Sequence, residues 1–223
     1  PTTAFKVRGG IVLLHSINQS KAQPKGLISA TRGNHGQSLS YAGKRMGMPV
    51  TIVVPESNSL DQNDCIRGHG ANLIIHGKDF EAARAHALGL QQEYDYRVVA
   101  AFERDLVLGV ATYALELFSQ LKDLDTVYVP VGMGSGIVGL IKTRDLLGLK
   151  TKIVGVVSEG ASAWKLSFNA GRVITTADAI TIADGIATSA PPEEAFEVVK
   201  NGADRVISVN DDQIAAAMYH YYT

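Results

Sequence analysis

Hydrophobic and polar residues follow two alternating patterns along the 223-residue chain. Short runs rich in β-branched residues recur, and each precedes a longer stretch whose apolar residues return every three or four positions. The short runs predict strands, and the longer stretches predict the helices that join them in parallel. We therefore expect an α/β fold, with strands at 26–30, 50–54, 72–75, 97–101, 127–131, 153–157 and 205–209.

Two of the helical stretches indicate which of their sides faces a core. In each, apolar residues recur at the spacing of a single helix face. We expect these faces to pack against a sheet: Leu39, Ala42 and Met46 in the first stretch, and Leu106, Val110, Tyr113 and Leu117 in the second.

Charge and composition narrow the classes of partner. Twenty-one Lys and Arg residues against 22 Asp and Glu give a net charge of -1, which attracts neither nucleic acid nor an anionic membrane. No apolar run approaches the ~20 residues of a membrane span. The single cysteine, Cys65, cannot form an internal disulfide. We expect a cytoplasmic protein, and the ends of the chain suggest part of a longer one.

A glycine-rich loop follows the strand predicted at 127–131 and precedes a helix. Residues 129–139 read V-P-V-G-M-G-S-G-I-V-G, and such a loop directs backbone amides and a helix N-terminus at an anion. We predict a phosphate site there. The run 134–139 also fits a dinucleotide fingerprint, with Glu159 as its ribose-binding acid, although several predicted strands precede it.

Two further segments contain candidate chemistry. The run S-A-T-R-G-N-H-G-Q at 29–37 leads from a strand into a helix, where Thr31, Asn34 and free amides suit a carboxylate or phenolic oxygen. An ordinary polar helix cap fits the same residues. Lys6 stands among small and apolar residues, and burial would make it a base or nucleophile. A solvated surface lysine fits that pattern as well.

Taken together, these segments resemble the fold type II pyridoxal-phosphate enzymes, in the group of threonine dehydratase and serine racemase. The run T-A-F-K-V-R-G-G at 3–10 is similar to the lysine motif of that family, 33–37 to its substrate loop and 132–139 to its phosphate loop. The run I-T-I-A-D-G at 180–185 is a fourth match, in the family's order. The dinucleotide interpretation becomes remote.

The resemblance implies the two-domain parallel-sheet fold shared with the tryptophan synthase β subunit. A small domain at 26–103 would be inserted in a large domain formed by 1–25 and 104–223. The large domain is expected to be incomplete, because relatives continue and normally supply the partner of the pyridine nitrogen from a later segment. A homodimer is also implied.

The resemblance further implies a site for pyridoxal 5'-phosphate. Lys6 would hold the cofactor as an internal aldimine and act as the base, with Phe5 beside the ring and Asn34 on its phenolic oxygen. Thr31, Asn34 and His35 would bind the substrate carboxylate, with a structural role for the His35 ring. The phosphate would be held by the amides of Gly132, Met133, Gly134, Ser135 and Gly136.

The implied reaction is the dehydration and deamination of a β-hydroxy amino acid (threonine, serine or 3-hydroxyaspartate) to a 2-oxo acid and ammonia. A racemase, a β-replacement enzyme and a catalytically silent fragment remain alternatives. Arg32 departs from the family, which usually has a small residue at this position. In the racemases that small residue is the serine that acts as the second base. An arginine at this place would engage a second substrate carboxylate, unless it is turned to solvent.

Some relatives bind a divalent cation after the strand that matches 153–157. The acidic contacts would fall at Val157, Ala161 and Ala163, and only Glu159 offers a carboxylate there. We therefore predict no metal.

Overall fold

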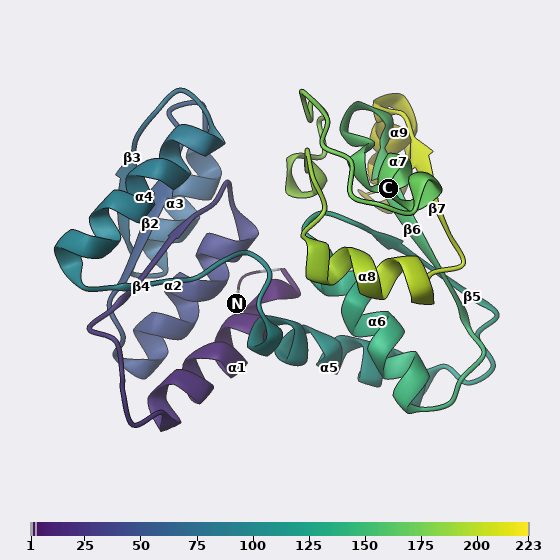
Figure 1. The fold of residues 1–223 in the computed structure, drawn as a ribbon, viewed down its shortest axis with the longest axis horizontal. Coiled ribbons are helices and arrows are strands. Elements are labelled where there is room, and N and C mark those ends of the chain that lie inside the picture. The colour runs from purple at the N-terminus through teal and green to yellow at the C-terminus, as the bar shows by residue number, and fades with distance from the viewer. Residues whose placement is uncertain (1, 3, 223) are drawn as a thin grey trace. The chain divides into compact units, whose positions relative to one another are not determined.

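The computed structural model describes residues 2 and 4–222. It divides into two compact units, Pro1–Val110 and Ala111–Thr223, and the boundary falls inside a long helix, α5 (Arg104–Gln120). Each unit has its own parallel sheet with helices packed against it (Figure 1). The α/β class with parallel sheets is therefore confirmed.

The first unit contains a four-stranded sheet in the order β3-β2-β1-β4. Leu27 of β1 pairs with Val50 of β2 on one side and with Arg97 of β4 on the other. The elements are α1 (Lys6–Gln19), β1 (Leu27–Ala30), α2 (Asn34–Met46), β2 (Val50–Val54), α3 (Leu60–Gly68), β3 (Asn72–Ile75), α4 (Phe80–Tyr94) and β4 (Arg97–Val98).

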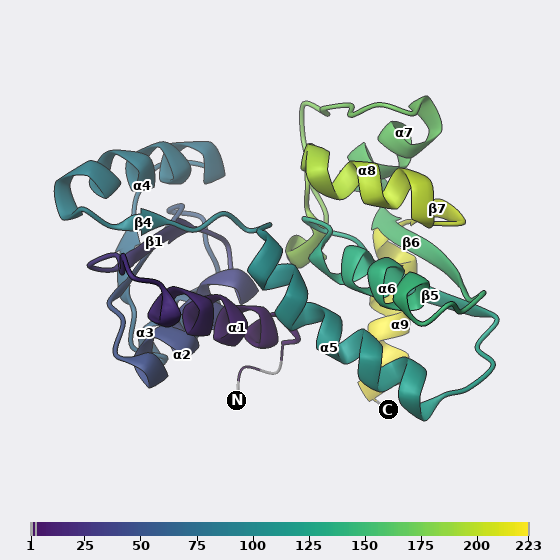
Figure 2. The ribbon, with the colours of Figure 1, turned by 60° about the horizontal axis from the view of Figure 1, so that its bottom comes forward.

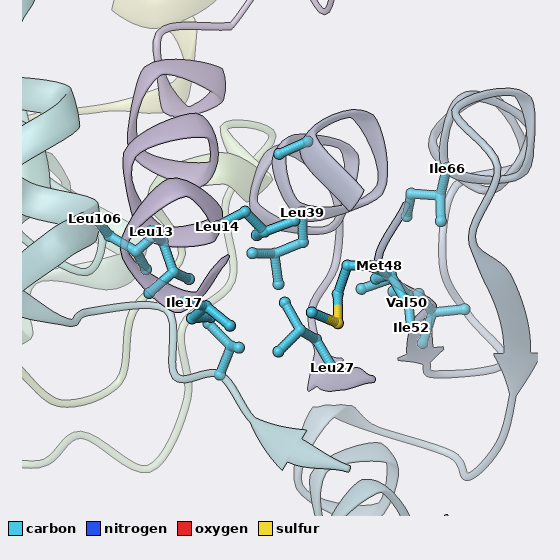
Figure 3. Close-up of a cluster of buried hydrophobic side chains, with 13 residues drawn as sticks. Leu13, Leu14, Ile17, Leu27, Leu39, Met48, Val50, Ile52, Ile66 and Leu106 are labelled. Carbon is cyan, nitrogen blue, oxygen red and sulfur yellow. The ribbon is translucent and has the colours of Figure 1, made fainter. Parts of the chain in front are cut away.

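Both faces of this sheet are covered, because alternate residues of a strand point to opposite sides. Leu27 and Ile52 belong to a core shared with α1, α2 and α3, whereas Ile28 and Val53 pack with α4. Figure 2 shows α4 on one side of these strands and α1, α2 and α3 on the other. Figure 3 shows the larger core, in which leucines of α1 and α2 lie over the sheet.

The second unit contains a three-stranded parallel sheet in the order β5-β6-β7. Its largest fully buried side chains include Trp164, Phe196, Ile137 and Ile141. The elements are β5 (Thr126–Pro130), α6 (Ser135–Leu146), β6 (Lys152–Ser158), the 3-10 turn η1 (Glu159–Ala161), α7 (Ala163–Ala170), the 3-10 turn η2 (Asp184–Ile186), α8 (Glu193–Gly202), β7 (Arg205–Val209) and α9 (Asp211–Tyr222).

Every predicted strand is present, and its ends differ from the prediction by at most one residue except at 97–101. There the strand stops at Val98, because the amide of Ala100 donates to the Glu103 carboxylate at 2.8 Å and the chain turns into α5. The predicted face of α2 is confirmed: Leu39 and Ala42 are buried, and Met46 packs against the same core.

The predicted face of α5 was partly wrong. Its buried side chains larger than glycine follow steps of four, whereas two predicted members are only half-buried. The Tyr113 hydroxyl donates to the carbonyl of Gly136 at 3.0 Å, so the tip of that ring meets a polar group. The buried positions are Leu106, Val110, Ala114 and Phe118, and the half-buried ones are Tyr113 and Leu117.

The inserted small domain at 26–103 stays a prediction. Helix α1 packs closely against α2, and both belong to the first unit. Within the described residues, no helix combines the length and apolar character needed to cross a membrane.

Candidate active site

Lys6 is the first residue of α1, and contacts with α2 determine where that helix begins. The buried Ser38 hydroxyl donates to the Lys6 carbonyl at 2.6 Å and accepts from the Gly10 amide at 3.2 Å. A methyl group on Gly10 would collide with Ser38, so only glycine allows this approach of the two helices. Lys6 is thereby held at a defined place.

Charged and neutral forms of the Lys6 amino group coexist near physiological pH. Burial lowers the pKa of Lys6 to about 8, because the charged amine loses hydration. Its Nζ atom lies 5.9 Å from the centroid of the Phe5 ring, which is 43% exposed. The sequence left open whether this lysine is solvated. In the structure it is half-buried, so that a fraction of the amine is neutral near physiological pH.

The segment 31–37 forms a turn from β1 into α2. The buried Thr31 hydroxyl accepts from the Gly33 amide at 3.2 Å, and the Gln37 side chain donates to Gln62 at 2.7 Å. Arg32 and Asn34 are exposed. The first turn of α2 contains no acidic residue, so its positive end is not neutralised locally.

The amides of this turn are available to a ligand. In the described part of the chain, those of Asn34, His35 and Gly36 have no acceptor, as is usual in the first turn of a helix. An anionic oxygen placed there would receive hydrogen bonds and the favourable helix dipole.

His35 is the most deeply buried titratable side chain of this turn, at 5% exposure. Burial, and to a lesser degree the charge of Lys6, lower the pKa of His35 to about 3, although a hydrogen bond with the Val99 carbonyl acts in the opposite direction. Its Nε2 atom has no hydrogen-bond partner among the described residues. The ring is therefore neutral at physiological pH.

In the second unit, the glycine-rich loop joins β5 to α6, as predicted. Gly134 has φ +92°, which favours glycine, and α6 begins at Ser135. A Cβ atom on Gly132 would lie 2.8 Å from the Gly185 carbonyl oxygen. Within the described residues, the amides of 132–136 donate to no acceptor. These free donors at a helix N-terminus fit a phosphate group.

Residues distant in sequence hold this loop in shape. The buried Trp164 donates from Nε1 to the Gly132 carbonyl at 2.6 Å, and its ring lies against Gly134. Tyr113 donates to the Gly136 carbonyl, and the Thr188 hydroxyl lies 3.9 Å from the sulfur of Met133. Sequence analysis missed these supports, since nothing local to 132–136 signals a partner elsewhere in the chain.

The fourth matching segment, 180–185, packs against the same loop. Gly185 faces Gly132. Asp211 of α9 holds the segment by accepting hydrogen bonds from the Thr181 hydroxyl at 2.6 Å and from the Ile182 amide at 3.0 Å. Ser158, at the end of β6, also donates to Asp211 at 3.1 Å. The hydrogen bonds from Thr181, Ile182 and Ser158 hold the pKa of Asp211 below its usual value.

The predicted site residues are therefore distributed over both units. Lys6, Phe5, Thr31, Arg32, Asn34 and His35 lie in the first unit, and Gly132, Met133, Gly134, Ser135 and Gly136 lie in the second. Pro1 and Thr3, at the start of the lysine motif, lie outside the described residues. Among the described residues, no group of three His, Cys, Asp or Glu side chains could hold a metal ion.

Pyridoxal phosphate fits the donors that each unit offers. It has an aldehyde, which a neutral amine attacks, and a phosphate, which free amides at a helix N-terminus bind. The pKa of Lys6 and the unpartnered amides of 132–136 meet these two requirements.

Comparison with known proteins supports the same family. The model of the family described as pyridoxal-phosphate dependent enzyme matches residues 1–223. The biosynthetic L-threonine dehydratase IlvA of Escherichia coli is 31% identical over 219 residues, which are 98% of this chain and 42% of that protein. The chain thus spans less than half the length of this curated relative.

Solved structures agree with the sequence comparison. Processed threonine deaminase isoform 2 of Solanum lycopersicum has a TM-score of 0.91 at 31% identity, covering 99% of this chain and 64% of that one. Maize serine racemase has a TM-score of 0.92 at 27% identity, covering 98% and 66%. The fold is that of these fold type II enzymes, and the chain belongs to the family of pyridoxal-phosphate dependent enzymes.

Proposed function

We propose that this chain forms part of a lyase that converts a β-hydroxy amino acid to a 2-oxo acid and ammonia. The observation that carries the proposal is the Lys6 amine, whose pKa burial lowers to about 8, at the start of α1 in a chain of this family. Relatives named as threonine dehydratase and threonine deaminase support the reaction class.

Lys6 has two roles in this proposal. Its neutral amine would hold the cofactor, and the same amine, when free, would take the proton from the substrate α-carbon. Bound pyridoxal phosphate supplies an electron sink for the charge left on that carbon. A pKa of about 8 suits both roles, because the neutral and protonated amines then coexist near physiological pH.

The other proposed residues bind and orient. The amides of 132–136 would hold the phosphate, with Phe5 beside the cofactor ring and Asn34 at its phenolic oxygen. The substrate carboxylate binds at the N-terminus of α2, through Thr31, Asn34 and His35. Support comes from the unpartnered amides at this helix N-terminus and from the absence of acidic residues in its first turn.

The test is an absorbance spectrum of the chain with added pyridoxal phosphate, before and after borohydride. We expect a visible band that reduction removes, with the cofactor then found on Lys6 by peptide mass spectrometry, and no band for Lys6→Ala. Labelling of another lysine, or an identical band in Lys6→Ala, would contradict the proposal.

Product analysis then separates the reactions possible on this scaffold. We expect serine or threonine to yield a 2-oxo acid and ammonia. D-serine as the main product would favour a racemase, which the maize neighbour makes the second candidate. A thioether formed from serine and a thiol would favour β-replacement, and cofactor binding without any product would favour a silent fragment.

Arg32 supports a finer proposal, a preference for an acidic β-hydroxy amino acid such as 3-hydroxyaspartate. Arg32 is exposed in the turn 31–37, and its guanidinium would offer a planar fork to a second carboxylate. We expect Arg32→Ala to lower kcat/KM for 3-hydroxyaspartate relative to threonine by about tenfold, the loss of one charge-assisted hydrogen bond. Arg45→Ala, at an exposed position of α2, is the control, and an unchanged ratio in Arg32→Ala would refute the preference.

We further propose a cytoplasmic homodimer, on the resemblance to the family alone. Light scattering of the purified chain measures its mass in solution, and fractionation of cells measures its location.

A further inference from the structure

The carboxylate of Asp211, in the first turn of α9, accepts three hydrogen bonds from two other segments of the second unit. Its Oδ1 atom accepts from the Thr181 hydroxyl at 2.6 Å and from the Ser158 hydroxyl at 3.1 Å, and its Oδ2 atom accepts from the Ile182 amide at 3.0 Å. Hydrogen bonds to an ionised carboxylate are stronger than those between neutral groups. Asp211 therefore joins the end of β6, the segment 180–185 and α9.

A second contact holds the same segment against the 3-10 turn η1. The Ile180 amide donates to the Gly160 carbonyl at 2.8 Å, and a side chain on Gly160 would collide with the Ile180 carbonyl. The fully buried Ser158 hydroxyl accepts from the Gly160 amide at 3.2 Å, so this serine contributes to both contacts. The start of the segment is thus fixed to the end of β6 and to α9.

The fixed residues lead directly into η2, the turn that meets the phosphate loop (132–136). The Ile186 amide donates to the Ala183 carbonyl at 3.0 Å, which keeps this turn compact. A Cβ atom on Gly132 would lie 2.8 Å from the Gly185 carbonyl oxygen and 3.3 Å from the Ile186 Cα atom. Because the two backbones are in contact without a side chain between them, a shift of the turn displaces the loop.

We infer that Asp211 is a positioning residue for the phosphate loop and acts on it through the segment 180–185. The inference rests on the proposed role of that loop in binding phosphate. With the segment held, the loop is already ordered before an anion arrives, and ordering before binding favours affinity. Without the hydrogen bonds to Asp211, the loop has to be ordered as the phosphate binds, which weakens binding.

Replacing Asp211 with alanine removes all three acceptors at once and tests this role. We expect the dissociation constant of inorganic phosphate, measured from NMR shifts of the amides of 132–136, to rise about tenfold. Asp212→Ala, at an exposed position of the same helical turn, makes the same change in charge and is the matched control. It should bind phosphate like the wild type, and an equal loss in both variants would contradict the inference.

Thr181 allows a finer test with a conservative rescue. Thr181→Val keeps the shape of the side chain but removes the hydroxyl, whereas Thr181→Ser keeps the donor to Asp211. We expect Thr181→Val to weaken phosphate binding and Thr181→Ser to bind like the wild type. In a chain that already carries Asp211→Ala, Thr181→Val should cost less affinity than it does alone, because both changes break the same contact. Additive losses, or an equal loss in the serine variant, would argue against a shared contact.

A general loss of stability has to be separated from this specific effect. Ile153 is fully buried in the first half of β6, away from Ser158 at its end, and Ile153→Val removes one buried methyl group. We expect Ile153→Val to lower the urea midpoint of unfolding and leave phosphate affinity unchanged. Unchanged affinity in Asp211→Ala, or weakened affinity in Ile153→Val, would overturn the inference.

Hydrogen exchange of the unmodified chain tests the same coupling should a variant fail to fold. The Ile182 amide exchanges when its bond to Asp211 opens. Coupling is reciprocal, so if opening weakens phosphate binding about tenfold, saturating phosphate makes opening rarer by the same factor and slows exchange at Ile182 about tenfold. The Gln213 amide, which donates to the Asn210 side chain at the start of α9, should exchange at an unchanged rate.

Exchange at Ile182 that does not respond to phosphate would refute the coupling, and so would an unmodified chain whose loop 132–136 binds no phosphate. Neither measurement involves Lys6 or pyridoxal phosphate. Failure of the chain to attach the cofactor would therefore refute the proposed function and leave this result standing.

Discussion

Replacing Lys6 with methionine is expected to stabilise the cofactor-free chain at neutral pH while abolishing attachment of the cofactor. Burial lowers the pKa of Lys6 from 10.5 to about 8, so the folded state disfavours the charged amine. One pKa unit corresponds to about 1.4 kcal/mol, and allowing for solvent screening of a half-buried residue we expect a gain of about 2 kcal/mol in Lys6→Met.

The stability gain of Lys6→Met should depend on pH. Between pH 10.5 and about 8 the unfolded chain binds more protons at Lys6 than the folded chain, so stability is lost as the pH falls through this range. The advantage of Lys6→Met is therefore full below about pH 8 and vanishes above pH 10.5. Urea unfolding at both pH values measures it, with Lys44→Met, at an exposed position of α2, as the control. A gain independent of pH would contradict this explanation.

Replacing Trp164 with alanine is expected to destabilise the chain by about 3–5 kcal/mol, the usual cost of removing a large buried aromatic residue. Trp164 has no exposed surface, and its ring packs beside Phe196 and against Gly134. Urea unfolding measures the loss. Leu166→Ala, at an exposed position of the same helix, should change stability by less than about 0.5 kcal/mol.

Trp164→Phe separates the support of the loop from packing. Phenylalanine keeps most of the apolar contact but cannot donate to the Gly132 carbonyl, so we expect a cost of about 1 kcal/mol together with weaker binding of pyridoxal phosphate. The affinity is measured by titration followed by absorbance. If Trp164→Phe binds the cofactor as tightly as the wild type, this hydrogen bond does not position the phosphate loop.

Much of the fold could be predicted because strands and glycine-rich turns have local signatures. The apolar runs at 50–54 and 205–209 are strands at their predicted bounds, and Gly134 has the positive φ that a tight turn into a helix requires. The end of β4 was not predicted, since it depends on the Glu103 carboxylate, just before α5, accepting from the Ala100 amide.

The supports of the candidate site were beyond sequence reasoning because their partners lie far apart along the chain. Trp164 is 32 positions from Gly132, and Asp211 is 30 positions from Thr181. Such bonds form only because crossover helices bring the ends of parallel strands to one edge of a sheet.

By itself, the sequence determined the α/β class and most of the strand positions, and it predicted a phosphate site at residues 132–136, because hydrophobic period and glycine spacing act over a few residues. Only the tertiary structure decided the chemistry of Lys6 and His35. Burial lowers the pKa of both residues, and the charge of Lys6 lowers that of His35 further. No local pattern encodes the loss of hydration that tertiary packing causes.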